Sequence, residues 1–191
     1  MISEFETKRL RARPIELSDA PRVTELFQEK DLAWNLGRAP WPYALKDAEN
    51  WLKIVARQWA AETEFPFAIL KDDTLIGCCG IVQIDAEQNI WEIGYWVGKP
   101  YWGKGYVTEA SIGLLDWAEG ELGITRLVSG HIFDNPASGR VLLKLGFTVA
   151  GEIEMYVKGR DCEVKAVRYV YGGAPAEVAL ALPHFTAEAK S

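Results

Sequence analysis

The sequence predicts a single α/β domain with a mixed, mainly antiparallel central sheet flanked by about four helices. Two observations lead to this prediction. Three consecutive strand-like segments are joined by short turns, which fit antiparallel hairpins. A helical crossover joins only one pair of strands, and such a connection suggests parallel neighbours. The domain is expected to cover residues 1–173, and residues 174–191 are expected to form a C-terminal tail.

The N-terminal part is expected to supply one strand and two helices. Residues 7–15 carry charges on alternate positions, which predicts an edge strand. A proline in the first turn and apolar residues on one face predict a helix over 19–30. Residues 31–45 are rich in tryptophan and proline and have no period, so a structured loop is expected. A second helix is expected over 47–61.

The rest of the chain is expected to alternate between strands and helices. In order, the expected elements are strands at 65–71, 74–84 and 90–97, a helix from 107 to 122, a strand at 124–133, a helix at 136–145, and strands near 148–157 and 162–171. The crossover helix lies between the strands at 90–97 and 124–133. These two strands are therefore the expected parallel pair.

Composition excludes several classes of function. A length of 191 residues, 49% hydrophobic residues and 25% charged residues are ordinary for one soluble globular domain. The net charge of −6 argues against a nucleic-acid partner held by a basic surface. No apolar run is long enough to span a membrane, and the three cysteines do not form a disulfide pattern. We therefore expect a cytoplasmic protein with no nucleic-acid or membrane partner.

A glycine-rich turn follows the strand at 90–97. The run Gly103-Lys104-Gly105 allows backbone N–H groups to approach a ligand without an intervening Cβ. The helix that begins there adds unpaired N–H groups and the positive end of its dipole, which suits a phosphate. A plain tight connection between strand and helix would show the same pattern, so this turn alone leaves both interpretations open.

The strand before this turn contains a carboxylate among apolar residues. Side-chain alternation places Glu92 on one face with Gly94 and Trp96, opposite Trp91, Ile93, Tyr95 and Val97. One interpretation is an edge or solvent-side glutamate. The other is a carboxylate desolvated by its neighbours, as a general base requires. Glu92 and Gly98, at the end of this strand, are separated by roughly 20 Å, so a ligand with phosphates at the turn would need a long thin arm to reach Glu92.

The second candidate segment begins at Asn135. Asn135 suits a helix N-cap and Pro136 the first helical position, so capping alone explains both residues. If this helix start lies beside the glycine-rich turn, the Asn135 amide, the Ser138 hydroxyl and the Arg140 cation become ligand groups. No residues show the spacing of metal ligands, so no metal site is expected.

Together these segments resemble the Gcn5-related N-acetyltransferase (GNAT) superfamily, and within it the ribosomal-protein N-terminal acetyltransferases, the RimJ/RimL-like group. The resemblance spans about residues 5–171. It is carried by Thr7-Lys8-Arg9-Leu10 with Arg13-Pro14, by Glu92 to Val97, by Trp102 to Ala110, and by Asn135-Pro136-Ala137-Ser138 with Lys144 to Phe147. The family implies acetyl-CoA as co-substrate, whose pyrophosphate and long pantetheine arm match the separation of the two candidate groups.

The resemblance implies a role for each matching position. The pyrophosphate would be held by the backbone N–H groups of Gly103, Lys104, Gly105, Tyr106 and Val107. The family usually has Gln or Arg where this chain has Trp102, and often Gly or Ala where it has Val107. Pantetheine would pair with the backbone at Trp96 and Val97, and the Trp96 N–H would polarise the acetyl carbonyl. Asn135 would bind the pantetheine arm, Ser138 would lie near the thiol, and Glu92 matches the common general-base position.

The expected reaction is direct acetyl transfer to an amine, because no activated nucleophile for an acyl-enzyme is visible. Glu92 would remove the proton of the amine, and Ser138 would donate to the departing thiolate. The reference pKa of an α-amine is about 7.7–8.0, against about 10.4 for lysine, which favours a terminal amine. Trp34, Trp41 and Tyr43 in the loop 31–45 are the candidate acceptor wall, unless they belong to the core.

Two alternatives remain open. One is an acetyltransferase for a small amine such as an antibiotic or a polyamine, which acidic residues around the pocket would favour. The other is a non-catalytic acyl-CoA sensor, which would have no use for a carboxylate at Glu92. The expected partners are thus acetyl-CoA and an amine acceptor, and a homodimer is left open.

Overall fold

The computed structural model describes residues 4–181. Its strands are β1 (Phe5–Glu6), β2 (Arg11–Pro14), β3 (Glu64–Lys71), β4 (Thr74–Asp85), β5 (Ile90–Val97), β6 (Arg126–Ile132), β7 (Thr148–Val157) and β8 (Cys162–Tyr171). Its helices are α1 (Ala20–Leu26), α2 (Lys30–Trp34), α3 (Leu45–Ala60), α4 (Tyr106–Leu122), α5 (Pro136–Lys144) and α6 (Ala176–Ala181), with short 3-10 turns at η1 (Leu17–Asp19) and η2 (Lys99–Tyr101).

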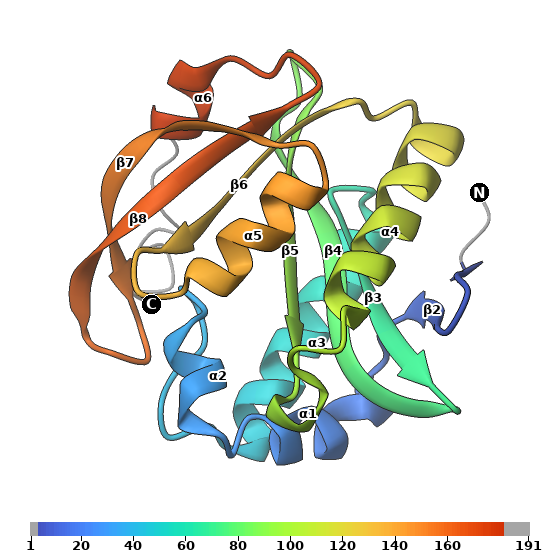
Figure 1. Ribbon diagram of the computed structural model, residues 1–191. Helices are drawn as coiled ribbons and strands as arrows, with labels where there is room; N and C mark the ends of the chain where they lie inside the picture. Colours follow the sequence, from blue (N-terminus) through green and yellow to red (C-terminus); the bar gives the residue numbers. More distant parts are fainter. Residues whose placement is uncertain (1–3, 182–191) are drawn as a thin grey trace.

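The strands form one eight-stranded sheet in the order β1-β2-β3-β4-β5-β6-β8-β7 (Figure 1). Among these strands, β5 and β6 are parallel, and all the other neighbours are antiparallel. The predicted fold class and the predicted parallel pair are therefore confirmed. The parallel pair arises because α4 returns the chain to the end of the sheet where β5 begins, and β6 then runs in the same direction as β5.

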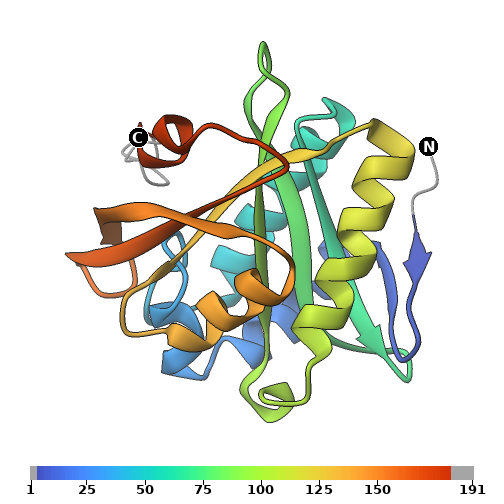
Figure 2. The same ribbon diagram turned by 45° about the horizontal axis from the view of Figure 1, so that its top comes forward.

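Two apolar clusters cover the two faces of the sheet. On one face, α4 and α5 pack on a cluster that includes Phe65, Phe67, Trp91 and Ile93. On the other face, α1 and α3 pack on a cluster that includes Ala68, Cys78 and Trp96. Figure 2 shows α4 and α5 in front of the sheet and α3 behind it. The alternation predicted for β5 is confirmed, because Trp91 and Ile93 lie in one cluster and Trp96 in the other.

The N-terminal region differs from the prediction. The strand expected over 7–15 is interrupted, because the Thr7 N–H donates to the Leu10 carbonyl at 2.8 Å and closes a turn. The sheet edge is consequently β1, which precedes this turn. The helix expected over 19–30 ends at Leu26, and α2 occupies the start of the expected loop. With five residues, α2 is too short to show a helical period in the sequence.

The expected tail begins with a segment that packs on the sheet. Ala174 and Ala179 are buried in a cluster with residues of β5 and β6. The Arg168 Nε donates to the Ala179 carbonyl at 3.0 Å and ties α6 to β8. The described part of the expected tail is thus docked, whereas residues 182–191 lie outside the described residues. The domain boundary after residue 173 stays a prediction.

The feature that positions the site is the short contact between β5 and β6. The two strands pair at Ile90 with Arg126, at Trp91 with Leu127 and at Glu92 with Val128. Beyond these pairs β5 continues to Val97 and β6 diverges from it (Figure 1). The second half of β5 therefore has no strand neighbour on that side. Among residues 4–181, no helix combines the length and apolar character that crossing a lipid bilayer requires.

Candidate active site

The glycine-rich turn adopts the backbone conformation that the sequence pattern predicts. Gly103 and Gly105 have φ angles of +72° and +77°, in the left-handed region that favours glycine. Gly105 is the N-cap of α4, and the first helical hydrogen bond there runs from the Glu109 N–H to the Gly105 carbonyl at 3.0 Å. The N–H groups of Tyr106 and Val107 precede this bond. They are thus placed to bind an anion at a helix N-terminus.

An N-terminal segment holds the turn in place. The Glu109 carboxylate accepts hydrogen bonds from the Thr7 hydroxyl at 2.7 Å, from the Arg9 N–H at 2.7 Å and from Arg9 Nε at 2.6 Å. Arg9 also donates to the Lys104 carbonyl at 3.1 Å and lies 4.7 Å above the Tyr106 ring. Burial alone would raise the pKa of Glu109, but the bonds from Thr7 and Arg9 outweigh it and lower that pKa.

This role of Thr7 and Arg9 was not predicted. The run Thr7-Lys8-Arg9-Leu10 carried the family resemblance, but its contact partner Glu109 is 100 residues away from Arg9 in the sequence. The sequence offers no local signal for such a contact. The physical consequence is that Arg9 holds both the turn, at the Lys104 carbonyl, and the first turn of α4, at Glu109.

The backbone groups that face the gap belong to alternate residues of β5. The Gly98 N–H donates to the Ile76 carbonyl of β4 at 2.9 Å, so alternation directs the backbone groups of Trp96 toward β4. The groups of Tyr95 and Val97 then face the gap, and the Val97 carbonyl accepts the Trp102 indole N–H at 2.7 Å. The assignment of the Trp96 N–H to the acetyl carbonyl is therefore wrong, and its side chain lies in the apolar cluster under α1 and α3.

One hollow near this gap lies between α2, Trp102 beside the glycine-rich turn, and the start of α5. It has a volume of about 410 Å³, and its lining includes Trp34, Trp102, Asn135, Ala137, Arg140 and Arg160. It brings together Trp34, Asn135 and Arg140, which the sequence assigned to acceptor and cofactor. Trp102, which stands where the family has Gln or Arg, lines the hollow and is 40% exposed as a residue.

The wall of this hollow is fixed by an arginine from the turn between β7 and β8. Arg160 binds both oxygens of Asp134, at 2.8 and 3.1 Å, and donates through Nε to the Trp34 carbonyl at 2.9 Å. The hydrogen bonds from Arg160 lower the pKa of Asp134. Sequence reasoning missed Arg160, because a charged residue in a hairpin turn is indistinguishable from a solvated one.

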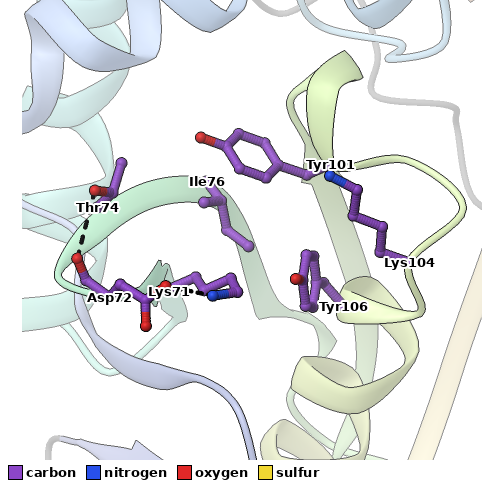
Figure 3. Close-up of a pocket in the computed structure, with 7 residues that line it drawn as sticks. All are labelled: Lys71, Asp72, Thr74, Ile76, Tyr101, Lys104 and Tyr106. Atoms are coloured by element: carbon purple, nitrogen blue, oxygen red, sulfur yellow. Dashed lines mark hydrogen bonds and ion pairs between the residues drawn. The ribbon is translucent and has the colours of Figure 1, made fainter.

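A second, smaller hollow of about 250 Å³ lies on the other flank of the turn. Figure 3 shows the rings of Tyr101 and Tyr106 on one side of it, with Lys71 and Asp72 across from them. The Lys104 amine donates to the Pro100 carbonyl at 2.9 Å. The Tyr106 side chain lines this smaller hollow. Its contribution to the anion site at the start of α4 is therefore its backbone N–H.

The start of α5 has the predicted cap. The Asn135 side-chain oxygen accepts the Ser138 N–H at 3.4 Å, and Pro136 occupies the first helical position. The Ser138 hydroxyl lies 3.1 Å from the Tyr95 hydroxyl. The sequence places Tyr95 on the face of β5 opposite Glu92 and predicts no functional role for it.

Glu92 is buried and paired. Its Oε1 accepts a hydrogen bond from Arg168 Nη1 at 2.8 Å, and the two side chains are 9% and 3% exposed. The solvent-side interpretation of Glu92 is therefore wrong. The buried interpretation of Glu92 holds, and its carboxylate is paired with the Arg168 guanidinium instead of lying among apolar groups alone. Arg168 was missed, although an arginine within the apolar run Val167 to Val170 is itself a signal of a buried partner.

The face of the sheet that carries Glu92 is open at Gly94. Gly94 is exposed, and a Cβ there would meet no atom within 4 Å. The register Glu64–Val82–Glu92 places a second carboxylate two strands away on the same face. Burial raises the pKa of Glu64, and the charge of Arg38 opposes that shift. This face thus offers bare backbone at Gly94, bordered by two carboxylates that each have an arginine nearby.

The three predicted acceptor aromatics do not form one wall. Trp34 lines the larger hollow. Tyr43 is 7% exposed and stacks on Phe27, with ring centroids 4.4 Å apart, and Trp41 packs against the same apolar cluster. Burial raises the pKa of Tyr43 above its ordinary value. Acceptor contacts by Trp41 and Tyr43 stay predictions.

Comparison with known proteins identifies the family. A family model described as an acetyltransferase (GNAT) domain matches residues 9–148. The chain belongs to the GNAT acetyltransferase family. The predicted superfamily and the predicted acetyl-CoA-dependent N-acetyltransferase are confirmed at this level.

In residues 4–181, no group of three or more His, Cys, Asp or Glu side chains is arranged to hold a metal ion.

Individual relatives agree with this assignment. The uncharacterized N-acetyltransferase p20 of Bacillus licheniformis is 28% identical over 156 residues, which cover 81% of this chain and 87% of p20. The ribosomal-protein-serine acetyltransferase of Escherichia coli K12 is 29% identical over 129 residues, covering 64% and 70%. The solved microcin C7 self immunity acetyltransferase MccE, in complex with acetyl-CoA and AMP, shares the fold with a TM-score of 0.76, at 22% identity and with coverage of 85% and 92%.

Proposed function

We propose that this GNAT protein transfers the acetyl group of acetyl-CoA directly to the N-terminal amine of a protein or peptide. The observation that carries the proposal is the gap where β6 leaves β5, directly beside a left-handed glycine turn at a helix N-terminus. A long ligand with a phosphate end and a thin arm fits these two features together. A relative named for ribosomal-protein acetylation supports a protein acceptor.

The co-substrate is proposed to bind along these two features. The pyrophosphate lies on the backbone N–H groups of residues 103–107, and Asn135 and Arg140 approach it or the pantetheine arm from α5. The arm runs beside β5, where the backbone groups of Tyr95 and the Val97 N–H face the gap for hydrogen bonds and for polarising the acetyl carbonyl. The thioester then lies near Ser138.

The amine is proposed to approach over Gly94, on the face of the sheet opposite the one that α5 covers. Glu92 borders this opening, so it stays the candidate base that takes the amine proton through water. Ser138 donates a hydrogen bond to the sulfur as the carbon–sulfur bond breaks and negative charge develops there. A homodimer and a cytoplasmic location stay predictions from the sequence.

The alternative of a small polyamine acceptor has one observation in its favour. Glu64 and Glu92 lie on one face, two strands apart, and Glu64 adds a carboxylate beside the proposed amine opening that a second positive charge on the acceptor would approach. A peptide N-terminus carries a single charge at the reacting end. The two acceptor classes are therefore separated by direct assay.

The first prediction concerns the acceptor. With acetyl-CoA and a peptide that has a free N-terminus, the protein is expected to release free CoA thiol, measured with a thiol-reactive dye. The same peptide with a blocked N-terminus and an internal lysine is expected to release none, because lysine has the higher pKa. Release with spermidine or an aminoglycoside and none with any free-terminus peptide would establish the small-amine alternative.

The second prediction separates two tryptophans of the loop 31–45. Trp34→Ala is expected to raise the acceptor KM about tenfold, since truncating an aromatic contact costs about 1–2 kcal/mol. Trp41→Ala is expected to lower Tm with near-normal kinetics, because Trp41 packs against the core. Equal losses of Tm with unchanged KM in both variants would assign both residues to the core.

A further inference from the structure

A polar contact links β5 to the first turn of α5. The Tyr95 hydroxyl donates to the Ser138 carbonyl, with the oxygens 3.1 Å apart, and lies equally close to Ser138 Oγ. Tyr95 comes from the half of β5 that has no strand neighbour in the gap. The residue proposed to act at the sulfur is therefore in contact with a second hydroxyl that neither the sequence nor the family assignment explains.

The first turn of α5 packs closely against side chains of β6 and β8. A Cβ on Gly139 would lie 2.5 Å from His131 Nε2 and 3.0 Å from the Tyr169 hydroxyl, so glycine allows close approach at this position. His131 Nδ1 lies 2.7 Å from the Ile132 carbonyl, which can only accept, so Nδ1 carries a proton. His131 Nε2 then accepts from the Tyr169 hydroxyl at 3.2 Å in the neutral ring. His131 and Tyr169 thus hold each other by a hydrogen bond and pack directly beneath the first turn of α5.

The Tyr95 hydroxyl has one proton and two acceptors within reach. Burial raises the pKa of Tyr95, so the hydroxyl remains a neutral donor near pH 7. When it donates to the Ser138 carbonyl, its oxygen can accept the Ser138 O–H and hold that proton away from the gap. When it donates to Ser138 Oγ, the Ser138 O–H is released to bond another acceptor.

We propose that Tyr95 is a positioning residue that fixes Ser138 Oγ and turns its O–H toward the sulfur of acetyl-CoA. The inference rests on the proposed function, because it needs Ser138 to lie beside the thioester. Tyr95 forms and breaks no covalent bond in this role. It supplies a hydrogen bond to Oγ while Ser138 donates its own hydrogen bond to the sulfur, on which negative charge accumulates as the carbon–sulfur bond breaks.

The test is a double-mutant cycle on the full chain with Tyr95→Phe, Ser138→Ala and the combination. Each single variant is expected to lower kcat about tenfold, with the stabilisation by acetyl-CoA near the wild-type value. The combined variant is expected to be no slower than the worse single variant, because both changes remove one unit. Tyr171→Phe, which deletes a hydroxyl on β8 without touching Ser138, is the matched control and should keep the wild-type kcat.

Four other results would contradict the role of Tyr95, the role of Ser138 or the proposed function, and each can be told from the others. A hundredfold loss in the combined variant would show that Tyr95 and Ser138 act independently, which contradicts the proposal. A lower Tm in Tyr95→Phe with an unchanged kcat would assign Tyr95 to packing only. An unaffected Ser138→Ala enzyme would refute the role of Ser138, and with it that of Tyr95, while acetyl transfer itself stands. A wild-type protein that acetylates no amine would refute the proposed function and this inference together.

Discussion

Glu92→Gln is expected to lower the free energy of unfolding by about 3–5 kcal/mol, because it leaves the buried Arg168 without its counter-charge. If Glu92 is also the general base, kcat is expected to fall by about 10²–10⁴-fold in the same variant. Denaturant unfolding gives the first quantity. Initial rates, measured at a temperature where the variant remains folded, give the second.

Arg168→Met separates these two effects. It also breaks the buried ion pair and is expected to destabilise the fold by a similar amount, but it keeps the Glu92 carboxylate. Because Arg168→Met retains the proton-accepting carboxylate and Glu92→Gln removes it, a base at Glu92 predicts a retained kcat in Arg168→Met and a lost kcat in Glu92→Gln. Equal loss of activity in the two variants would indicate that the pair only maintains the fold. A folded Glu92→Gln protein with full activity would remove Glu92 from the mechanism, leaving alignment and a polarised carbonyl as the sources of catalysis.

Gly105→Val is expected to abolish the stabilisation of the protein by acetyl-CoA. At one hundred times Kd, a ligand that binds only the native state stabilises it by about 2.7 kcal/mol. Gly105 has a φ of +77°, which a β-branched residue adopts only with strain, and its new side chain would extend toward Arg9. The turn then changes shape, and its N–H groups no longer converge on the pyrophosphate.

Gly123→Val is the matched control for this prediction. Gly123 ends the same helix α4 with a φ of +64°, and a Cβ there would meet nothing within 4 Å. Both variants are expected to lose roughly 1–2 kcal/mol from left-handed strain. The response to acetyl-CoA, measured as the shift in Tm, is expected to disappear only in Gly105→Val. A full response in that variant would place the phosphates elsewhere.

Part of the site could be predicted because its determinants are local. The left-handed turn at Gly105 and the cap at Asn135 depend on residues within one helical turn of each other. The alternation along β5 depends only on the period of a strand. The parallel pairing of β5 with β6 follows from a single crossover helix, which the hydrophobic period of α4 reveals.

The errors concern segments and contacts that carry no such local signal. The five residues of α2 are too few for a helical period, so the sequence predicts a loop there. The direction of the Trp96 N–H depends on which residues of β5 bond to β4, and that register is set by the whole hairpin.

The sequence by itself determined the family, the order of the elements from β3 to β8, and the backbone of the glycine-rich turn, because each depends on periodicity or on neighbouring residues. Only the tertiary structure decided the partners of the reactive side chains. Arg168 meets Glu92 across 76 positions, and Tyr95 meets Ser138 across 43. These contacts exist because the sheet order places β8 beside β6 and because α5 stands over the gap. The sequence does not indicate which group a charged or hydroxyl side chain will contact, and the order of the strands in the sheet determines that partner.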